Sequence, residues 1–97
     1  MNKLIEIKQK LKNLKPQLEK EYFIKQIGIF GSYLREEQTK ESDIDVLVEF
    51  KKPVSLLKII SLENYISDIL EIKVDIVPKN NIRKELKKHI LKEAELV

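Results

Sequence analysis

The sequence predicts a small α+β domain in two layers, with a mixed β-sheet and helices packed on one face of that sheet. Two observations support this α/β prediction. Three short segments rich in β-branched and aromatic residues alternate with longer segments of helical periodicity. Their order along the chain is helix, short helix, strand, strand, helix, strand, helix. Because 97 residues can bury only one modest core, residues 1–97 are expected to fold as a single domain.

Composition excludes several classes of protein. Hydrophobic residues make up 42% of the chain, which is enough for a folded core. The absence of cysteine excludes disulfide scaffolds, zinc knuckles and cysteine nucleophiles. A net charge of +3 is far below that of a dedicated nucleic-acid binder, so strong nucleic-acid binding is not expected. The same absence of cysteine favours a reducing cytoplasm as the location. No signal peptide and no apolar run of about 20 residues is visible, so we expect no membrane partner.

The N-terminal part predicts helix and then strand. Residues 2–14 form an amphipathic helix, because apolar side chains recur every three or four positions: Leu4, Ile7, Leu11 and Leu14. Pro16 is expected to end this helix and to begin a second short helix over residues 16–22. Residues 24–30 are rich in β-branched and aromatic residues and predict the first strand, which Gly31 follows.

The middle of the chain contains the clearest strand. Residues 32–36 are expected to form a short helical turn and residues 37–42 a polar loop. Residues 43–50 alternate between two faces of a strand. One face is apolar and the other begins with Asp43 and Asp45.

The C-terminal half predicts two helices around one more strand. Residues 55–70 carry an apolar stripe at helical spacing, and Ser55 is expected to cap this helix. Residues 72–77 form the third predicted strand, which Pro78 closes. The last predicted helix runs from about residue 82 to residue 95.

Three aspartates point to a metal site. Asp43 and Asp45 lie on one strand face, with their α-carbons roughly 6.6 Å apart. If the second and third strands are neighbours, Asp75 lies beside this pair. Carboxylates about 6 Å apart repel by about 3 kcal/mol per pair at an effective dielectric constant of 20, so such a cluster is expected to bind cations. Ligand sets made only of oxygen favour Mg²⁺ or Mn²⁺, and two-metal sites use this kind of carboxylate cluster.

The Gly31-Ser32 pair supplies a complementary phosphate site. Glycine at a strand end lets a phosphate approach the backbone closely, and the following turn directs free N–H groups at it. The Ser32 hydroxyl is a further donor. A phosphate cradle that faces a two-metal carboxylate cluster is typical of nucleotidyl transfer.

The spacing of these motifs resembles a known signature. Gly31-Ser32, ten residues, Asp43-x-Asp45 and a later strand aspartate are similar to the signature of the DNA polymerase β nucleotidyltransferase superfamily. Nearly the whole chain resembles the minimal nucleotidyltransferases (MNT domain), which are the antitoxin partners of HEPN toxins. This resemblance implies Mg²⁺-dependent transfer of AMP from ATP to a hydroxyl, a tyrosine of the cognate HEPN toxin. It also implies a hetero-oligomer with that toxin.

The resemblance assigns roles residue by residue. It implies a nucleotide-binding set of Gly31, Ser32 and Arg35, in which Arg35 matches an arginine often found after the Gly-Ser pair. It implies a catalytic and metal-binding set of Asp43, Asp45 and Asp75, in which Asp75 is either a ligand or the general base.

Two other functions remain as alternatives. The first is an antitoxin that neutralises its partner by binding alone and keeps a vestigial site, which the intact set of three carboxylates argues against. The second is a nucleotidyltransferase that acts on a small molecule or an RNA, with acceptor recognition supplied by a partner subunit.

Overall fold

The structure is a computed structural model that describes residues 3–35, 37–39 and 43–97. Its elements in chain order are α1 (Lys3–Tyr22), β1 (Ile24–Phe30), β2 (Ile44–Phe50), α2 (Leu56–Leu70), β3 (Val74–Pro78), the 3₁₀ turn η1 (Lys79–Asn81), α3 (Lys84–Glu93) and β4 (Glu95–Leu96). Within the described ranges, no helix is both long and apolar enough to cross a membrane.

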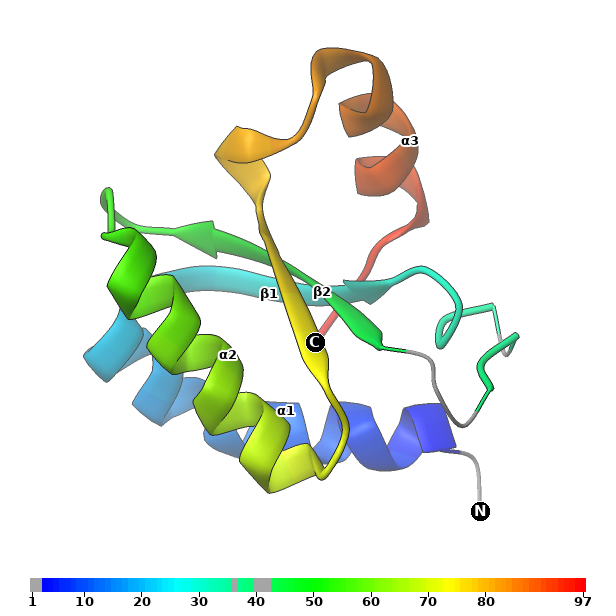
Figure 1. Cartoon of the computed structure of the whole chain (residues 1–97), viewed down its shortest axis with the longest axis horizontal. Coiled ribbons are helices and arrows are strands. Elements are labelled where there is room, and N and C mark those ends of the chain that lie inside the picture. Colours follow the sequence, from blue (N-terminus) through cyan, green and yellow to red (C-terminus); the bar gives the residue numbers. More distant parts are fainter. Residues whose placement is uncertain (1–2, 36, 40–42) are drawn as a thin grey trace.

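The four strands form one mixed sheet in the order β3-β2-β1-β4 (Figure 1). β1 is antiparallel to both β2 and β4, whereas β2 and β3 are parallel. The register places Phe30, the last residue of β1, opposite Asp45 and places Asp45 opposite Asp75. The sheet topology therefore brings the end of β1 and the starts of β2 and β3 together at one end of the sheet.

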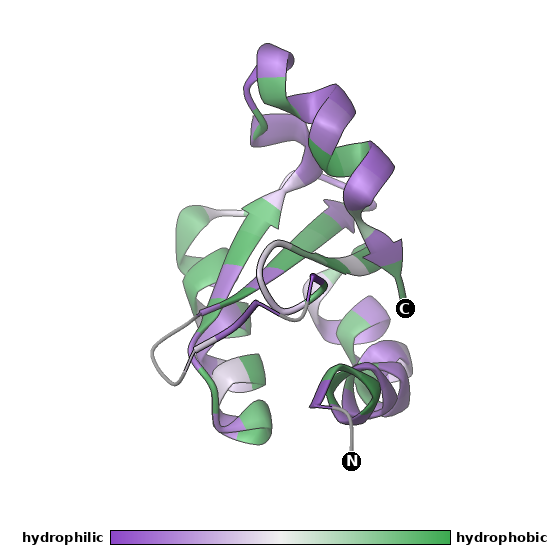
Figure 2. Cartoon of the chain, turned by 90° about the vertical axis from the view of Figure 1, so that its right-hand side faces the viewer, coloured by the Kyte–Doolittle hydropathy of each residue, from purple (hydrophilic) through white to green (hydrophobic). Residues whose placement is uncertain are grey.

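The core lies between the sheet and two helices. α1 and α2 cover one face of the sheet (Figure 1), which confirms the predicted two-layer α+β fold. The apolar face of β2 is fully buried there, through Ile44, Val46 and Val48. α3 lies on the other side of the sheet from α1 and α2 (Figures 1 and 2), where Leu91 and Leu47 line the same hollow. The sheet thus has one buried face and one partly open face.

Most predicted elements are confirmed within two residues at each end. β1 has the predicted bounds, and α2 begins directly after Ser55, whose Oγ accepts a hydrogen bond from the Lys58 backbone N–H at 3.1 Å. β2 and β3 differ from their predicted bounds by one or two residues. Turns follow at 32–35, as expected, and 37–39 lack regular structure. The rest of the predicted turn and polar loop, residues 36 and 40–42, lies outside the described residues.

The predicted break at Pro16 is wrong, because α1 continues through it as one helix of 20 residues. A proline inside a helix removes one backbone hydrogen bond and costs about 3 kcal/mol. Leu11 and Leu18 are fully buried on either side of Pro16, and burying a leucine side chain contributes about 1.5–3 kcal/mol. Anchoring on both sides therefore offsets the local cost.

The predicted last helix is too long at both ends. α3 stops at Glu93, and the next residues form β4, which pairs with Gly28 and Ile29 of β1. The chain end is held further by the Val97 N–H, which donates to the Ile27 carbonyl at 2.9 Å. Without β4, the backbone N–H and C=O groups along one side of β1 would be unpaired. Pairing with β1 therefore favours the extended conformation over the helix for the residues after Glu93.

Replacing Pro16 by alanine should stabilise the protein. Pro16→Ala restores a backbone donor inside α1, so we expect the free energy of unfolding to rise by up to about 3 kcal/mol. Each kcal/mol gained raises the Tm of a domain of this size by about 4–8 °C, which calorimetry will detect. Pro53→Ala, in the exposed segment between β2 and α2, is the matched control and should change little. A lower Tm for Pro16→Ala would contradict a continuous α1.

Candidate active site

Two aspartates lie side by side at the start of the parallel strands. Asp45 is the second residue of β2 and Asp75 the second residue of β3, and the register pairs them directly. Neighbouring strands are about 4.8 Å apart, and paired residues of a parallel ladder point to the same face. Asp43 precedes β2 by one residue and has the same parity along the chain as Asp45. The three aspartates therefore belong to one edge of the partly open sheet face.

Gly31 packs its backbone against the Asp45 carboxylate. Its φ is +83°, in the left-handed region that glycine adopts at no steric cost. A Cβ added at this position would overlap Oδ2 of Asp45. Any other residue would have to displace the carboxylate, so this position needs glycine for both its conformation and its contact.

The turn after Gly31 leaves two amides available. The Leu34 and Arg35 N–H groups donate to the Gly31 carbonyl at 3.1 and 3.2 Å. Tyr33 is buried in the core and fixes the turn to the sheet. In the described part of the chain, no acceptor is bonded to the amides of Ser32 and Tyr33. These N–H groups and the Ser32 hydroxyl are the donors that a phosphate requires.

The charges around Asp45 favour its protonated form. Burial raises the pKa of Asp45 first, and the neighbouring carboxylates of Asp75 and Asp43 raise it further. Glu93 acts in the same direction, whereas the Arg35 guanidinium lowers the pKa of Asp45. The net result is a carboxyl group whose pKa is above its ordinary value, in a site with more negative than positive charge.

Arg35 and Glu93 form an ion pair that joins the Gly31 turn to α3. Nη1 of Arg35 contacts Oε1 of Glu93, and its Nε lies 3.4 Å from Oε1 of Glu37. His89 Nε2 lies 3.5 Å from the second carboxylate oxygen of Glu93. The Glu93 side chain is only 18% exposed, although it lies in the last turn of α3, where the helix dipole disfavours a carboxylate. α3 thus places a fourth acidic group in the site.

Sequence reasoning missed two charged neighbours of the site. Glu93 is 58 residues from Arg35, and no spacing pattern links them. Lys73 precedes β3, and its Nζ lies 3.9 Å from Oδ2 of Asp43. The Lys73 carbonyl accepts a hydrogen bond from the Ile44 N–H at 2.9 Å, which connects the start of β2 to the residue before β3. These pairings depend on strand order, which one sequence does not reveal.

The donor set fits a hard divalent cation. Among the described residues, no three acidic, histidine or cysteine side chains converge closely enough to hold an ion as they stand. The three aspartates nevertheless offer only oxygen donors, from adjacent strands at one sheet edge, with mutual repulsion that a cation would relieve. Chemistry and strand placement therefore match Mg²⁺ or Mn²⁺ better than zinc.

Asp45→Asn should stabilise the fold at neutral pH. Because the pKa of Asp45 is raised in the folded state, folding favours its protonated form, and ionisation costs stability as pH rises through that pKa. We expect a higher Tm than wild type at pH 7 and no difference below the ordinary aspartate pKa of about 3.9. Asp68→Asn, on the exposed face of α2, is the matched control. A lower Tm for Asp45→Asn at pH 7 would contradict the carboxylate crowding.

The chain is similar along nearly all of its length to proteins named protein adenylyltransferases. MJ0126 of Methanocaldococcus jannaschii is 52% identical over 93 residues, which cover 96% of this chain and 95% of that protein. The protein adenylyltransferase MntA of Thermococcus cleftensis is 40% identical over 91 residues, which cover 94% and 92% of the two chains.

Solved structures share the fold. A structure assigned to the minimal nucleotidyltransferases superposes with a TM-score of 0.82 at 26% identity and covers 95% of this chain and 93% of that chain. A complex of a tri-AMPylated Shewanella oneidensis HEPN toxin with an MNT antitoxin gives a TM-score of 0.72 at 18% identity and covers 96% and 70%. The sequence profile of the nucleotidyltransferase domain matches residues 4–97. This chain therefore belongs to the nucleotidyltransferase domain family.

Proposed function

We propose that this protein is an antitoxin that transfers AMP from ATP to a tyrosine hydroxyl of a HEPN toxin, with Mg²⁺ as cofactor. The observation that carries the proposal is the β2–β3 register, which pairs Asp45 with Asp75 while Gly31 packs against Asp45. Two relatives support the protein acceptor: the one named protein adenylyltransferase MntA, and the MNT antitoxin found with a tri-AMPylated HEPN toxin. The pair would form a cytoplasmic hetero-oligomer.

The residues of the Gly31 turn bind and orient the triphosphate. The Ser32 and Tyr33 amides and the Ser32 hydroxyl donate to phosphate oxygens, directly after the glycine whose backbone packs against the Asp45 carboxylate. The Arg35 guanidinium adds charged donors beside Asp45. This arrangement fixes the β- and γ-phosphates so that the α-phosphate faces the carboxylates.

The aspartates serve the reacting atoms. Asp43, Asp45 and Asp75 would hold Mg²⁺, which when bound neutralises phosphate charge and activates the acceptor hydroxyl. The Asp75 side chain is exposed, so a hydroxyl arriving from solvent can reach it and transfer its proton to it. A bond forms between the acceptor oxygen and the α-phosphorus, the bond to the bridging oxygen of the β-phosphate breaks, and pyrophosphate leaves. Burial of Asp45 strengthens its electrostatic interactions.

Incubation with ATP, Mg²⁺ and the cognate HEPN toxin should add about 329 Da to the toxin for each AMP transferred, measured by intact-protein mass spectrometry. Asp45→Asn should abolish the mass shift. Ser32→Ala should slow it by up to roughly 10²–10³, the loss expected for one donor to a developing charge. Asp68→Asn should transfer at the wild-type rate.

The same variants separate chemistry from binding. If Asp45→Asn fails to modify the toxin and also fails to protect cells from it, neutralisation depends on transfer. If Asp45→Asn protects cells fully, contact alone neutralises the toxin, and the proposed mechanism is wrong.

A further inference from the structure

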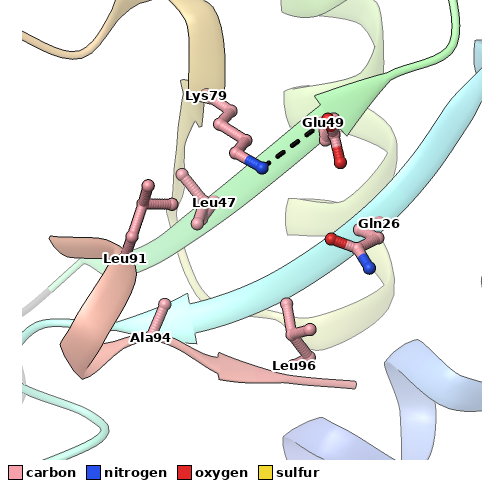
Figure 3. A pocket seen from close by; sticks show the side chains of 7 residues that line it. All are labelled: Gln26, Leu47, Glu49, Lys79, Leu91, Ala94 and Leu96. Atoms are coloured by element: carbon pink, nitrogen blue, oxygen red, sulfur yellow. Dashed lines mark ion pairs between the residues drawn. The ribbon is translucent and has the colours of Figure 1, made fainter. Parts of the chain in front are cut away.

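A hollow of about 300 Å³ lies on the partly open face of the sheet (Figure 3). Its apolar wall comes from three elements: Leu47 of β2, Leu91 of α3 and Leu96 of β4. Leu47 is two residues after Asp45 on the same strand, so it shares the face of that carboxylate at a distance of roughly 6.6 Å along β2. The hollow therefore lies on the same sheet face as Asp45, one same-face position further along β2.

The hollow and the Gly31 turn lie on opposite sides of Asp45. Phe30 is paired with Asp45 at the end of β1, directly before Gly31. In the other direction along the same two strands, Gln26 is paired with Glu49, roughly 13 Å from Asp45 along β2. A ligand whose phosphates occupy the Gly31 turn and whose α-phosphate faces Asp45 can therefore extend the rest of its structure along β2 to the hollow.

The far end of the hollow is polar. Figure 3 shows the Gln26 amide beside an ion pair in which Lys79 Nζ lies 3.6 Å from Oε2 of Glu49. Within the described residues, the Gln26 side chain has no hydrogen-bond partner. A glutamine amide can donate to N7 and accept from N6–H of adenine at the same time. An apolar wall near Asp45 and an amide beyond it match a flat base with polar atoms on its outer edge.

An acceptor tyrosine fits this hollow less well. The only polar atom of a phenol ring is its hydroxyl, which must lie at the α-phosphate near Asp45. Its ring would then bring no polar atom to the far end, and Gln26 and the Glu49–Lys79 pair would lose water without a new partner. Adenine can pack its ring against the apolar wall and also offer polar atoms to the Gln26 amide at the far end of the hollow.

We propose that this hollow binds the adenine base of the nucleotide, with Leu47, Leu91 and Leu96 against the ring and Gln26 at its edge. The inference rests on the proposed function, because it takes ATP as the substrate. It adds that α3 and β4, which follow all the predicted catalytic residues in the chain, complete a base site on the face of β1 and β2.

The test compares two ligands that share only the triphosphate. Binding of ATP and of inorganic tripolyphosphate, each with Mg²⁺, is measured by calorimetry. Wild type should bind ATP more tightly than tripolyphosphate. Leu91→Trp fills the hollow and should weaken ATP binding by about tenfold or more, while tripolyphosphate binding stays within about twofold of wild type. Leu86→Trp is the matched control: it changes an exposed leucine of the same helix outside the hollow and should leave both affinities unchanged.

A second variant guards against misfolding of the first. Gln26 is an exposed residue of β1, so Gln26→Leu should not disturb the core. This variant should reduce the preference for binding ATP over GTP without changing the affinity for tripolyphosphate. Unchanged ATP affinity in folded Leu91→Trp, or equal affinity of wild type for ATP and tripolyphosphate, would overturn the base site but leave the phosphate site intact. If wild type binds neither ligand, the proposed function itself fails.

Discussion

The Asp45 carboxylate lies between the Gly31 backbone on one side and Asp75 of the neighbouring strand on the other. The like charges of Asp45 and Asp75 repel each other. They remain adjacent because buried apolar side chains on the opposite face of the sheet fix the register of β2 and β3. Ile44, Val46 and Val48 are completely buried there, and a slip by one residue would expose them and bury the aspartates instead. The apolar core therefore imposes the crowding that a cation and a triphosphate would relieve, a local instability typical of functional sites.

The C-terminal segment completes the site. α3 brings Glu93 to Arg35 of the Gly31 turn, and β4 brings Leu96 to the face that carries Leu47. Ion pairing of Lys8 with Glu95 and the hydrogen bond from Lys15 to the Val97 carbonyl at 3.0 Å tie this segment to α1. β4 thus contacts the helical layer, pairs with β1 at the edge of the sheet, and contributes to the open face on which the substrate would lie.

Local chemistry made much of this structure predictable. β1 is rich in isoleucine and ends at Phe30, directly before Gly31, α2 has a serine cap, and the alternation in β2 separates aspartates from aliphatic residues. The continuous α1 was not predictable from local sequence. Pro16 destabilises the helix through local backbone geometry, whereas Leu11 and Leu18 stabilise it by burial against the rest of the fold, which appears only in the tertiary structure. The two residues of β4 have no periodicity to detect, and the partnership of Glu93 with Arg35 depends on where α3 lies after the sheet has formed.

Paramagnetic Mn²⁺ tests the metal site most directly, because its effect on backbone amide signals falls steeply with distance. In a titration followed by NMR, the amides of Gly31, Ser32, Ile44 and Asp75 should broaden first, and this selectivity should be absent in Asp45→Asn. Those amides lie at the sheet edge where the three aspartates meet. Broadening centred on another acidic region, such as Glu19 and Glu21 of α1, or identical broadening in Asp45→Asn, would contradict a metal centre built from Asp43, Asp45 and Asp75.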